Sequence, residues 1–489
     1  MLKEKSLITN AIFNIFYKLL NVLFPLISYM YLARVLLPEG IGRATAVQNN
    51  VSYFLILATL GIPAYGVREI SKLRKNGKEL NKTFSEILLL NGLFTLISCT
   101  LFIVAITVVP LFNNDSKLYL IYGISIFINL INVDWLYQGL EEYVYITIRS
   151  MVVKILTLAA LIVFVRDISD IYIYALISVL ATSGNYIFNI FHCRKVVKFS
   201  LCNIRPKRHI KSLIYLALCT ISTELYARMD ITMLGVMNTD AQVGYYTYAY
   251  RIINIVIAFL VAVTAVFLPR LSFYFITNRE KFNHLVTFGF NFTFLISLPA
   301  CVGLAFVAEP AVVVLFGEEF RASATILSIL APMIPLKCVG DIVCYQVMMS
   351  AGKEATLMKS YFLVMVANFI NNMILIPRFN ASGAAVASVI SEILAFVFVF
   401  YFSRKIVEIK YDKTNICATF LGSCLIGIIC FIIDKIEASD YLKLFFSLIL
   451  SVSIYLLINV ILKNHFYMNI VNGVKAKIIN KLKRGNSNG

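Results

Sequence analysis

Ten charged residues lie inside long apolar segments of this 489-residue chain, where an isolated charge is costly. Three of them occur in the stretch ISTELYARMDITMLG at residues 221–235. Glu224 and Arg228 are one helical turn apart and can pair on one face, whereas Asp230 points nearly opposite Arg228. The full set is five cations and five anions: Lys18, Lys154, Arg228, Arg251, Lys337, Asp134, Glu224, Asp230, Asp341 and Glu392.

Two roles stay open for the charges that can pair along one helix. Lys337 and Asp341 repeat the i,i+4 spacing of Glu224 and Arg228, so both pairs are candidates for structural salt bridges. The other possibility is that they line a polar cavity. Because cations and anions are equal in number, charge counting does not choose between an anionic and a cationic substrate.

Arg251 is the best candidate to contact an anion. It has no acidic residue within one helical turn in the sequence GYYTYAYRIINIV. The tyrosines beside it, including Tyr248, fit an aromatic belt at the membrane interface, and they could instead present ring faces to sugars.

A polar stripe follows the first apolar segment, with steps of three or four residues that keep its members on one helix face. One or two such residues suffice for hydrogen bonds between helices, whereas six including a lysine favour contact with water or substrate. The stripe consists of Asn10, Asn14, Lys18, Asn21, Pro25 and Ser28.

The composition identifies the medium in which these residues lie. Hydrophobic residues make up 60% of the chain and charged residues only 14%, which predicts an all-α, multi-pass integral membrane protein. About fourteen segments approach the roughly 20 apolar residues that a spanning helix needs. They are centred near residues 22, 53, 97, 128, 155, 180, 224, 257, 296, 335, 366, 392, 424 and 452.

The distribution of basic residues predicts the orientation. With the N-terminus in the cytoplasm, inside segments hold 31 basic residues and outside segments hold 8. This bias predicts that both termini are cytoplasmic, and it assigns the net charge of +18 to contact with anionic membrane lipids and not to nucleic acid. The basic, amphipathic tail 466–489 is expected to lie at the cytoplasmic interface.

An internal repeat is visible at an offset near 200 residues. Gly42 to Arg68 and Gly244 to Arg270 share a spacing of 26 residues at an offset of 202, and DWLYQ at residue 134 resembles DIVCYQ at residue 341. We therefore expect two six-helix lobes, residues 1–200 and 205–405, related by a pseudo-twofold axis along the membrane normal. Two further helices are expected in residues 406–465.

The remaining motifs argue against catalysis and metal binding. The ten cysteines include no C-x-x-C pair, the four histidines have no metal-ligand spacing, and no phosphate-binding GxxxxGK[ST] loop is present. The outside loops are too short for a catalytic domain. We expect a transporter without cofactors, driven by Na⁺, H⁺ or the membrane potential.

Three stretches resemble a known family. They are LARVLLPEGIGRATAVQNNVSYFLILATLGIPAYGVREIS at 32–71, DWLYQGLEEYVYITIRSMVVKI at 134–155 and RMDITMLGVMNTDAQVGYYTYAYRI at 228–252. They look like the Wzx-type polysaccharide and O-antigen repeat-unit flippases of the multidrug/oligosaccharidyl-lipid/polysaccharide (MOP) exporter superfamily, and the likeness covers nearly the whole chain.

The resemblance implies a function in the bacterial cytoplasmic (inner) membrane. The implied activity is alternating-access export of undecaprenyl-pyrophosphate-linked oligosaccharides for capsule, O-antigen or exopolysaccharide synthesis, beside a polysaccharide polymerase and chain-length proteins. Lys18, Arg228 and Arg251 would line the central cavity.

Two alternatives lead to different experiments. A cation-coupled multidrug exporter of the same superfamily would use Asp134, Asp230 or Glu392 to bind its cation, and would confer resistance to cationic dyes. A membrane glycosyltransferase or polymerase is opposed by the short outside loops, and its loss would stop polymer formation while translocation continued.

Overall fold

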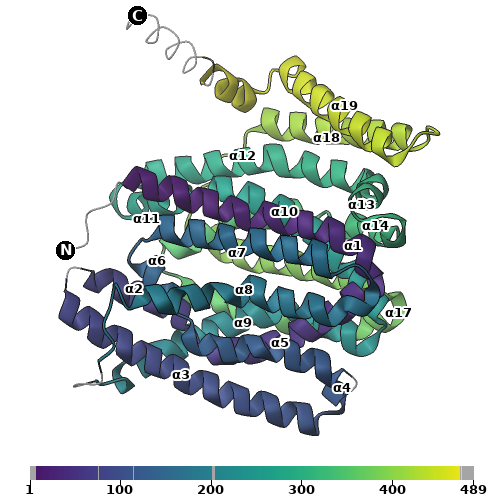
Figure 1. Cartoon of the computed structure of the whole chain (residues 1–489). Coiled ribbons are helices and arrows are strands. Elements are labelled where there is room, and N and C mark those ends of the chain that lie inside the picture. The colour runs from purple at the N-terminus through teal and green to yellow at the C-terminus, as the bar shows by residue number, and fades with distance from the viewer. Residues whose placement is uncertain (1–6, 75, 114, 201–203, 474, 476–489) are drawn as a thin grey trace, which may run out of the picture. The chain divides into compact units, whose positions relative to one another are not determined.

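The computed structural model describes a helical protein, and its described residues contain no strand (Figure 1). The described backbone comprises residues 7–74, 76–113, 115–200, 204–473 and 475, and the described side chains exclude 7–23, 215, 216, 218, 219, 222 and 223. The chain divides into two compact units, residues 1–247 and 248–489. The predicted lobes, 1–200 and 205–405, remain a prediction about an internal repeat, which this division by packing does not test.

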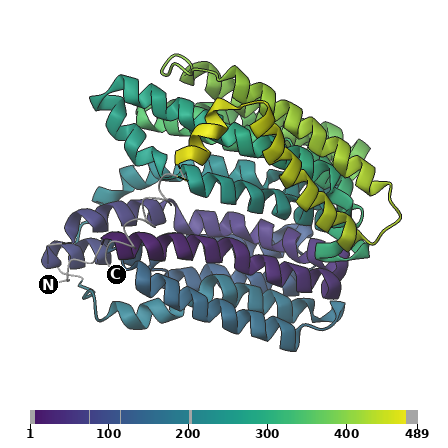
Figure 2. The ribbon, with the colours of Figure 1, turned by 90° about the horizontal axis from the view of Figure 1, so that it is seen from above.

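The first unit is built around a long kinked helix, α1, that packs against α3, α5, α7 and α9. Figure 2 shows its long helices running side by side. Its elements are α1 (Leu7–Thr59), α2 (Ile62–Leu73), α3 (Gly77–Val108), α4 (Pro110–Asn113), α5 (Ser116–Ile128), η1 (Asn129–Ile131), α6 (Asp134–Gly139), α7 (Tyr143–Phe164), η2 (Ile168–Asp170), α8 (Ile171–Cys193) and α9 (Lys207–Met237). Helix α10 (Asp240–Thr264) spans the boundary between the units.

The second unit packs α12 against α11, α15 and α18, while α19 packs on α18. Residues 465–473 form a further helical segment after α19. The elements are α11 (Phe267–Thr277), α12 (Arg279–Phe306), α13 (Ala308–Phe316), η3 (Glu318–Phe320), α14 (Ser323–Leu330), α15 (Met333–Gly340), the π-helix η4 (Asp341–Gln346), α16 (Val347–Ser350), α17 (Glu354–Ser403), α18 (Lys413–Asp434) and α19 (Asp440–Ile461).

Ten helical segments among the described residues are long and apolar enough to cross a membrane. Two of them, 24–73 and 354–403, are 50 residues long and contain a kink, at Leu37 (φ 57°) and at Asn380 (φ 52°). Each is long enough for two crossings of about 20 residues. All fourteen predicted centres fall in helical elements, while the count of fourteen spans stays a prediction.

The side chains are arranged as a membrane requires. Large apolar residues such as Leu101 and Ile103 of α3 are about half exposed, whereas Asn91 and Thr95 of the same helix are buried. Asn91 donates to the carbonyl of Asn129, and Asn129 donates to Thr95. Polar groups therefore satisfy one another inside the unit and leave apolar surface for lipid. This is a multi-pass membrane protein.

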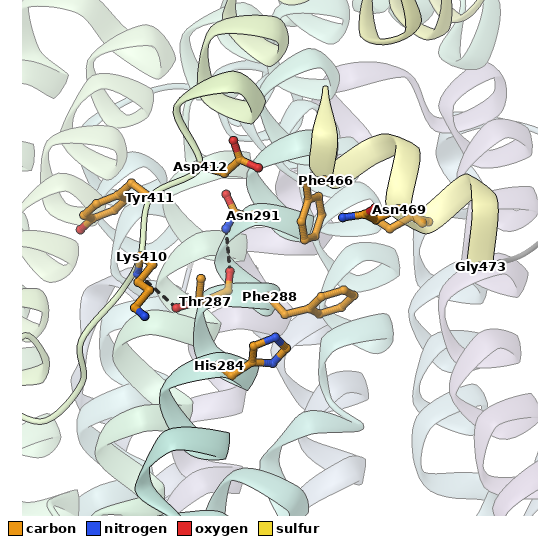
Figure 3. A pocket seen from close by; sticks show the side chains of 11 residues that line it. His284, Thr287, Phe288, Asn291, Lys410, Tyr411, Asp412, Phe466, Asn469 and Gly473 are labelled. Atoms are coloured by element: carbon orange, nitrogen blue, oxygen red, sulfur yellow. Dashed lines mark hydrogen bonds between the residues drawn. The ribbon is translucent and has the colours of Figure 1, made fainter. Parts of the chain in front are cut away.

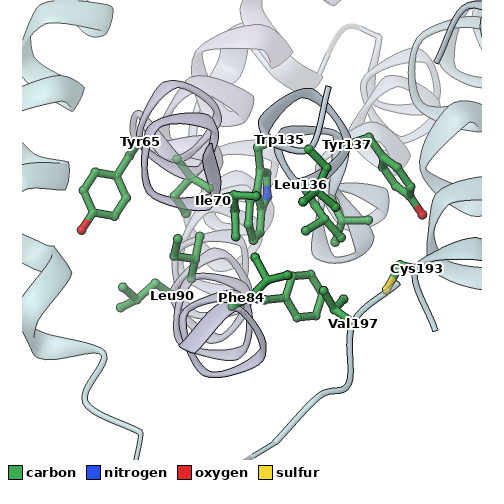
Figure 4. Packing of buried hydrophobic residues seen from close by; sticks show 14 of the residues in the cluster. Tyr65, Ile70, Phe84, Leu90, Trp135, Leu136, Tyr137, Cys193 and Val197 are labelled. Atoms are coloured by element: carbon green, nitrogen blue, oxygen red, sulfur yellow. The ribbon is translucent and has the colours of Figure 1, made fainter. Parts of the chain in front are cut away.

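Two of the motifs compared in the sequence, DWLYQ and DIVCYQ, each contribute to a buried core of their own unit. In the first unit α2 packs against α6, and the ring of Trp135 lies so close to Gly66 that a Cβ there would be 2.6 Å from it (Figure 4). The core around this contact includes Ile70, Phe84 and Tyr137. In the second unit Leu271 of α11 packs with Ile342 of the DIVCYQ segment.

Two glycines allow an unusually close backbone crossing inside the first unit. A Cβ on Gly42 would lie 1.7 Å from the carbonyl oxygen of Asp240, and a Cβ on Gly244 would lie 2.0 Å from that of Pro38. The contact is reciprocal, because Pro38 and Asp240, like Gly42 and Gly244, are 202 residues apart.

Candidate functional site

The polar residues of α1 and α9 meet in the first unit. Asn49, which is 4% exposed, donates to the Thr232 hydroxyl at 2.6 Å and to the Arg228 carbonyl at 3.2 Å. The hydroxyl of Tyr53 lies 2.6 Å from the Thr232 hydroxyl. These bonds fix α9 against α1 at the level of Arg228. The backbone of α9 at Arg228 is therefore held by a contact with α1.

Glu224 and Arg228 form the ion pair that their spacing predicts. The guanidinium Nε lies 2.9 Å from the Glu224 carboxylate, and the two side chains are 40% and 37% exposed. A pair this open contributes little to stability. Its Arg228 guanidinium, which can offer several N–H donors, is thus accessible to an anion.

Asp230 lies on the opposite side of α9, as predicted, and faces the core of the first unit. It is 8% exposed and accepts a hydrogen bond of 2.9 Å from the hydroxyl of Tyr246, which is 1% exposed. This bond joins α9 to the start of α10. Asp230 and Arg228 therefore have different surroundings although they are two residues apart.

Asp134 is part of a buried polar cluster that the sequence reasoning did not anticipate. Its carboxylate is 3.1 Å from the guanidinium of Arg149, and both residues hydrogen-bond to Asn189. The side chain of Arg149, on α7, is 4% exposed. The spacing of 15 residues between Asp134 and Arg149 carries no helical periodicity, so only the packing of α6, α7 and α8 reveals the pair.

A second unanticipated cluster surrounds Glu86 of α3, which is fully buried. Its carboxylate lies 2.7 Å from Arg208 and 2.7 Å from His209 Nε2, and it accepts a backbone N–H of Arg205 at 2.6 Å. The other ring nitrogen of His209 lies 2.5 Å from the Tyr65 hydroxyl. The cluster ties the start of α9 to α2 and α3. Its partners lie about 120 residues beyond Glu86 in the sequence, so no local spacing predicts the cluster.

The predicted pair of Lys337 and Asp341 is wrong. Lys337 instead forms its ion pair with Glu392 of α17, at 3.0 Å. Asp341 accepts hydrogen bonds from Gln346 at 2.7 Å and from Thr264 at 3.0 Å. The reason is local: residues 341–346 form a π-helix, which places Gln346 five residues on beside the Asp341 carboxylate.

Arg251 lies over an aromatic ring in the second unit. Its guanidinium carbon is 4.9 Å from the centroid of Tyr248, within range of a cation–π contact. Tyr248 is fully buried and stacks on Phe320 with centroids 4.7 Å apart, while Phe316 meets it edge-on. The ring of Tyr248 therefore supports Arg251 and does not face outward toward a sugar.

Of the remaining predicted site residues, those in the first part of α1 have side chains outside the described part of the chain, whereas Lys154 is described. The backbone of α1 is helical from Leu7, but the side chains of Asn10, Asn14, Lys18 and Asn21 are not among the described ones. Lys154 is described, and its ammonium lies 5.9 Å from the ring centroid of Phe24.

Solved structures of other proteins share this fold. The chain is similar to the solved structure of the lipid II flippase MurJ, with a TM-score of 0.74 and 16% identity over 95% of this chain and all of that one. An inward-facing MATE-family multidrug transporter of the MOP superfamily matches with a TM-score of 0.62 and 17% identity, over 78% of this chain and 94% of that one. The chain has the MOP transporter fold.

Sequence comparison then gives the family. Residues 7–275 match the family described as polysaccharide biosynthesis protein, and the chain belongs to it. A putative O-antigen transporter of Escherichia coli K12 is 23% identical over 396 residues, which are 78% of this chain and 93% of that protein. The probable low-salt glycan biosynthesis flippase Agl15 of Haloferax volcanii is 26% identical over 203 residues, 41% of this chain and 43% of that protein.

Proposed function

We propose that this protein moves a lipid-linked oligosaccharide across the bacterial cytoplasmic membrane. The observation that carries the proposal is the similarity to a putative O-antigen transporter over 93% of that protein, together with a fold similar to a lipid II flippase over the whole of that chain. The substrate would be an undecaprenyl-pyrophosphate-linked repeat unit, and the chain would act as a transporter and not as an enzyme.

The cations of the polar sites would receive the pyrophosphate. Arg228 is accessible beside Glu224, and Arg251 is held over the ring of Tyr248. Guanidinium groups bind phosphate oxygens with two parallel hydrogen bonds, so both suit a pyrophosphate. Lys18, Asn14 and Asn21 of α1 would be further contacts for the substrate.

Three carboxylates, Asp134, Asp230 and Glu392, are candidates to couple transport to a cation. Asp134 and Glu392 each form an ion pair, with Arg149 and Lys337. Asp230 instead accepts a hydrogen bond from the neutral hydroxyl of Tyr246. Asp134, Asp230 and Glu392 all remain candidates to bind H⁺ or Na⁺ during transport.

The mechanism would be alternating access, with the polar sites opening to one side of the membrane at a time. The crossing of Gly42 and Gly244 would hold α1 and the start of α10 together in one of these states. By the charge distribution this crossing lies toward the outer face, and both termini are cytoplasmic.

Lipid analysis of a deletion strain tests the proposal. Loss of the protein should trap an undecaprenyl-linked repeat unit on the cytoplasmic face, and expression of the chain should release it into polymer. Resistance to cationic dyes on overexpression, with normal glycan export in the deletion strain, would identify a multidrug exporter instead. Export of unpolymerised repeat units in the deletion strain would indicate a polymerase.

A further inference from the structure

A cavity of about 660 Å³, lined by both polar and aromatic side chains, lies in the second unit, apart from the charged sites described above (Figure 3). Figure 3 shows Lys410 and Tyr411 on one side of it and Phe466 and Asn469 on the other. Its third wall is the first part of α12, including His284 and Phe288. Three separate segments of the chain thus meet around one hollow.

The cavity is placed where the chain leaves the membrane. Three candidate spans begin or end beside it. One begins at Arg279, just before the lining residues of α12, and a second begins at Lys413, just after the 404–412 connector. A third ends at Ile461, just before the helical segment 465–473. The rings of Phe288 on α12 and Phe466 in segment 465–473 are in contact, with their centroids 5.3 Å apart. Tyrosine and tryptophan concentrate at the membrane–water interface, and Tyr411 lines the cavity, so the cavity opens at headgroup level.

The floor of the cavity is held by a buried chain of asparagines. Asn415 donates to the side chain and the carbonyl of Asn291, both at 3.1 Å, and Asn464 donates to Asn415 at 3.0 Å and to Asn459 at 2.7 Å. All four residues are at most 3% exposed. The backbone N–H of Lys410 is also fixed, because it donates to the Thr287 hydroxyl at 3.2 Å. The hollow is therefore a built feature between elements tied to one another.

Charge favours an anionic occupant. The segments around the cavity, residues 279–284, 404–413 and 463–473, contain seven basic and three acidic residues. Lys410 lines the cavity, whereas the lining carboxylate Asp412 already accepts N–H bonds from Thr414 and Asn415 as the cap of α18. Lys410 and the imidazole of His284 are left as the groups suited to a phosphate.

An apolar surface continues from the cavity along the same helix face. His284, Phe288 and Asn291 are followed on the same face of α12, seven residues or two turns further on, by Leu298, Val302 and Phe306, which line a second, almost wholly apolar cavity of about 510 Å³. Groups that can bind a phosphate therefore lie at the interface, and an apolar surface follows deeper in the membrane. A phospholipid has the same order of parts, a phosphate headgroup followed by acyl chains.

We infer that this cavity binds the headgroup of an anionic phospholipid, with its phosphate at Lys410 and His284 and its acyl chains along α12. The site is independent of the proposed oligosaccharide path. It would anchor the 465–473 segment against α12 in the membrane that the protein occupies.

Native mass spectrometry of the purified full-length protein tests the inference, with phosphatidylglycerol as the probe and phosphatidylcholine as the neutral comparison. Removing one lysine from such a surface lowers lipid affinity by about fivefold, so Lys410→Gln should retain about fivefold less phosphatidylglycerol. Lys413→Gln is the matched control, because it removes the same charge three residues on from a side chain that does not line the cavity. It should stay within about twofold of the parent.

A second variant separates occupancy of the cavity from surface charge. Asn469→Trp keeps every cation but fills the hollow, so it should also reduce phosphatidylglycerol retention. Equal losses in Lys410→Gln and Lys413→Gln, with no loss in Asn469→Trp, would overturn the inference in favour of general lipid attraction. Displacement of phosphatidylglycerol by inorganic phosphate at millimolar concentration would overturn it in favour of a free phosphate site.

Discussion

The substitution Gly42→Ala tests the close backbone crossing between α1 and the start of α10 directly. The added methyl carbon would lie 1.7 Å from the carbonyl oxygen of Asp240 and 2.8 Å from the backbone nitrogen of Gly244. Carbon–oxygen contacts of this kind are relaxed at about 3.3 Å, so α1 and α10 must separate by roughly 1.6 Å. Both obstacles are backbone atoms, and no side-chain rotation can relieve them.

The expected cost is that of an overpacked core, about 1–3 kcal/mol, reduced by the gain of about 1 kcal/mol that alanine has over glycine in a helix. Gly92→Ala is the matched control, because a Cβ there has no neighbour within 4 Å. It should therefore keep or raise stability. Gly244→Ala should repeat the loss, since its Cβ would lie 2.0 Å from the Pro38 carbonyl oxygen.

The assay is the thermal unfolding midpoint of each purified full-length variant in the same detergent. The double variant should lose less than the sum of the single losses, because one separation of the helices relieves both clashes. Equal midpoints for Gly42→Ala and Gly92→Ala would refute the close crossing. Additive losses in the double variant would refute its reciprocity.

Three further predictions concern Arg251, the ion pair of Lys337 with Glu392, and the orientation of the chain in the membrane. Arg251→Ala should lower glycan export about thirtyfold per folded protein in the membrane, from a loss of roughly 2 kcal/mol of phosphate binding, and Arg251→Lys should recover part of it; normal export at matched protein levels would exclude this role. Lys337→Met should lower stability by about 3–5 kcal/mol in thermal unfolding, because it leaves Glu392 buried without its cation, whereas adding Glu392→Leu should restore most of the loss; a single variant as stable as the parent would contradict the pair. Cys202, which lies outside the described residues, should react with a membrane-impermeant maleimide only in permeabilised cells, and labelling of intact cells would reverse the predicted orientation.

Several features of this protein are readable along the chain. The apolar segments required helices because only internally hydrogen-bonded backbone is stable in lipid. Glu224 and Arg228 could be paired from their spacing, and the structure has them 2.9 Å apart. The orientation of Asp230 away from Arg228 follows from the same periodicity. Each of these inferences uses neighbours on one helix, whose geometry does not depend on the rest of the fold.

Other features depend on which helices meet. Glu392 is 55 residues beyond Lys337, yet its carboxylate and not that of Asp341 completes the ion pair. The ion pair of Arg149 with Asp134 has no local spacing that predicts it, and it forms because α6, α7 and α8 pack together.

The sequence by itself determined the class of protein, its helices and the residues whose burial needs a partner. The tertiary structure decided who the partners are. The physical reason is that a charge in an apolar helix must be compensated, but any helix that packs beside it can supply the compensating group. The Gly42 crossing has the same origin: its glycine is visible in the sequence, but the carbonyl of Asp240 that requires it comes from another helix.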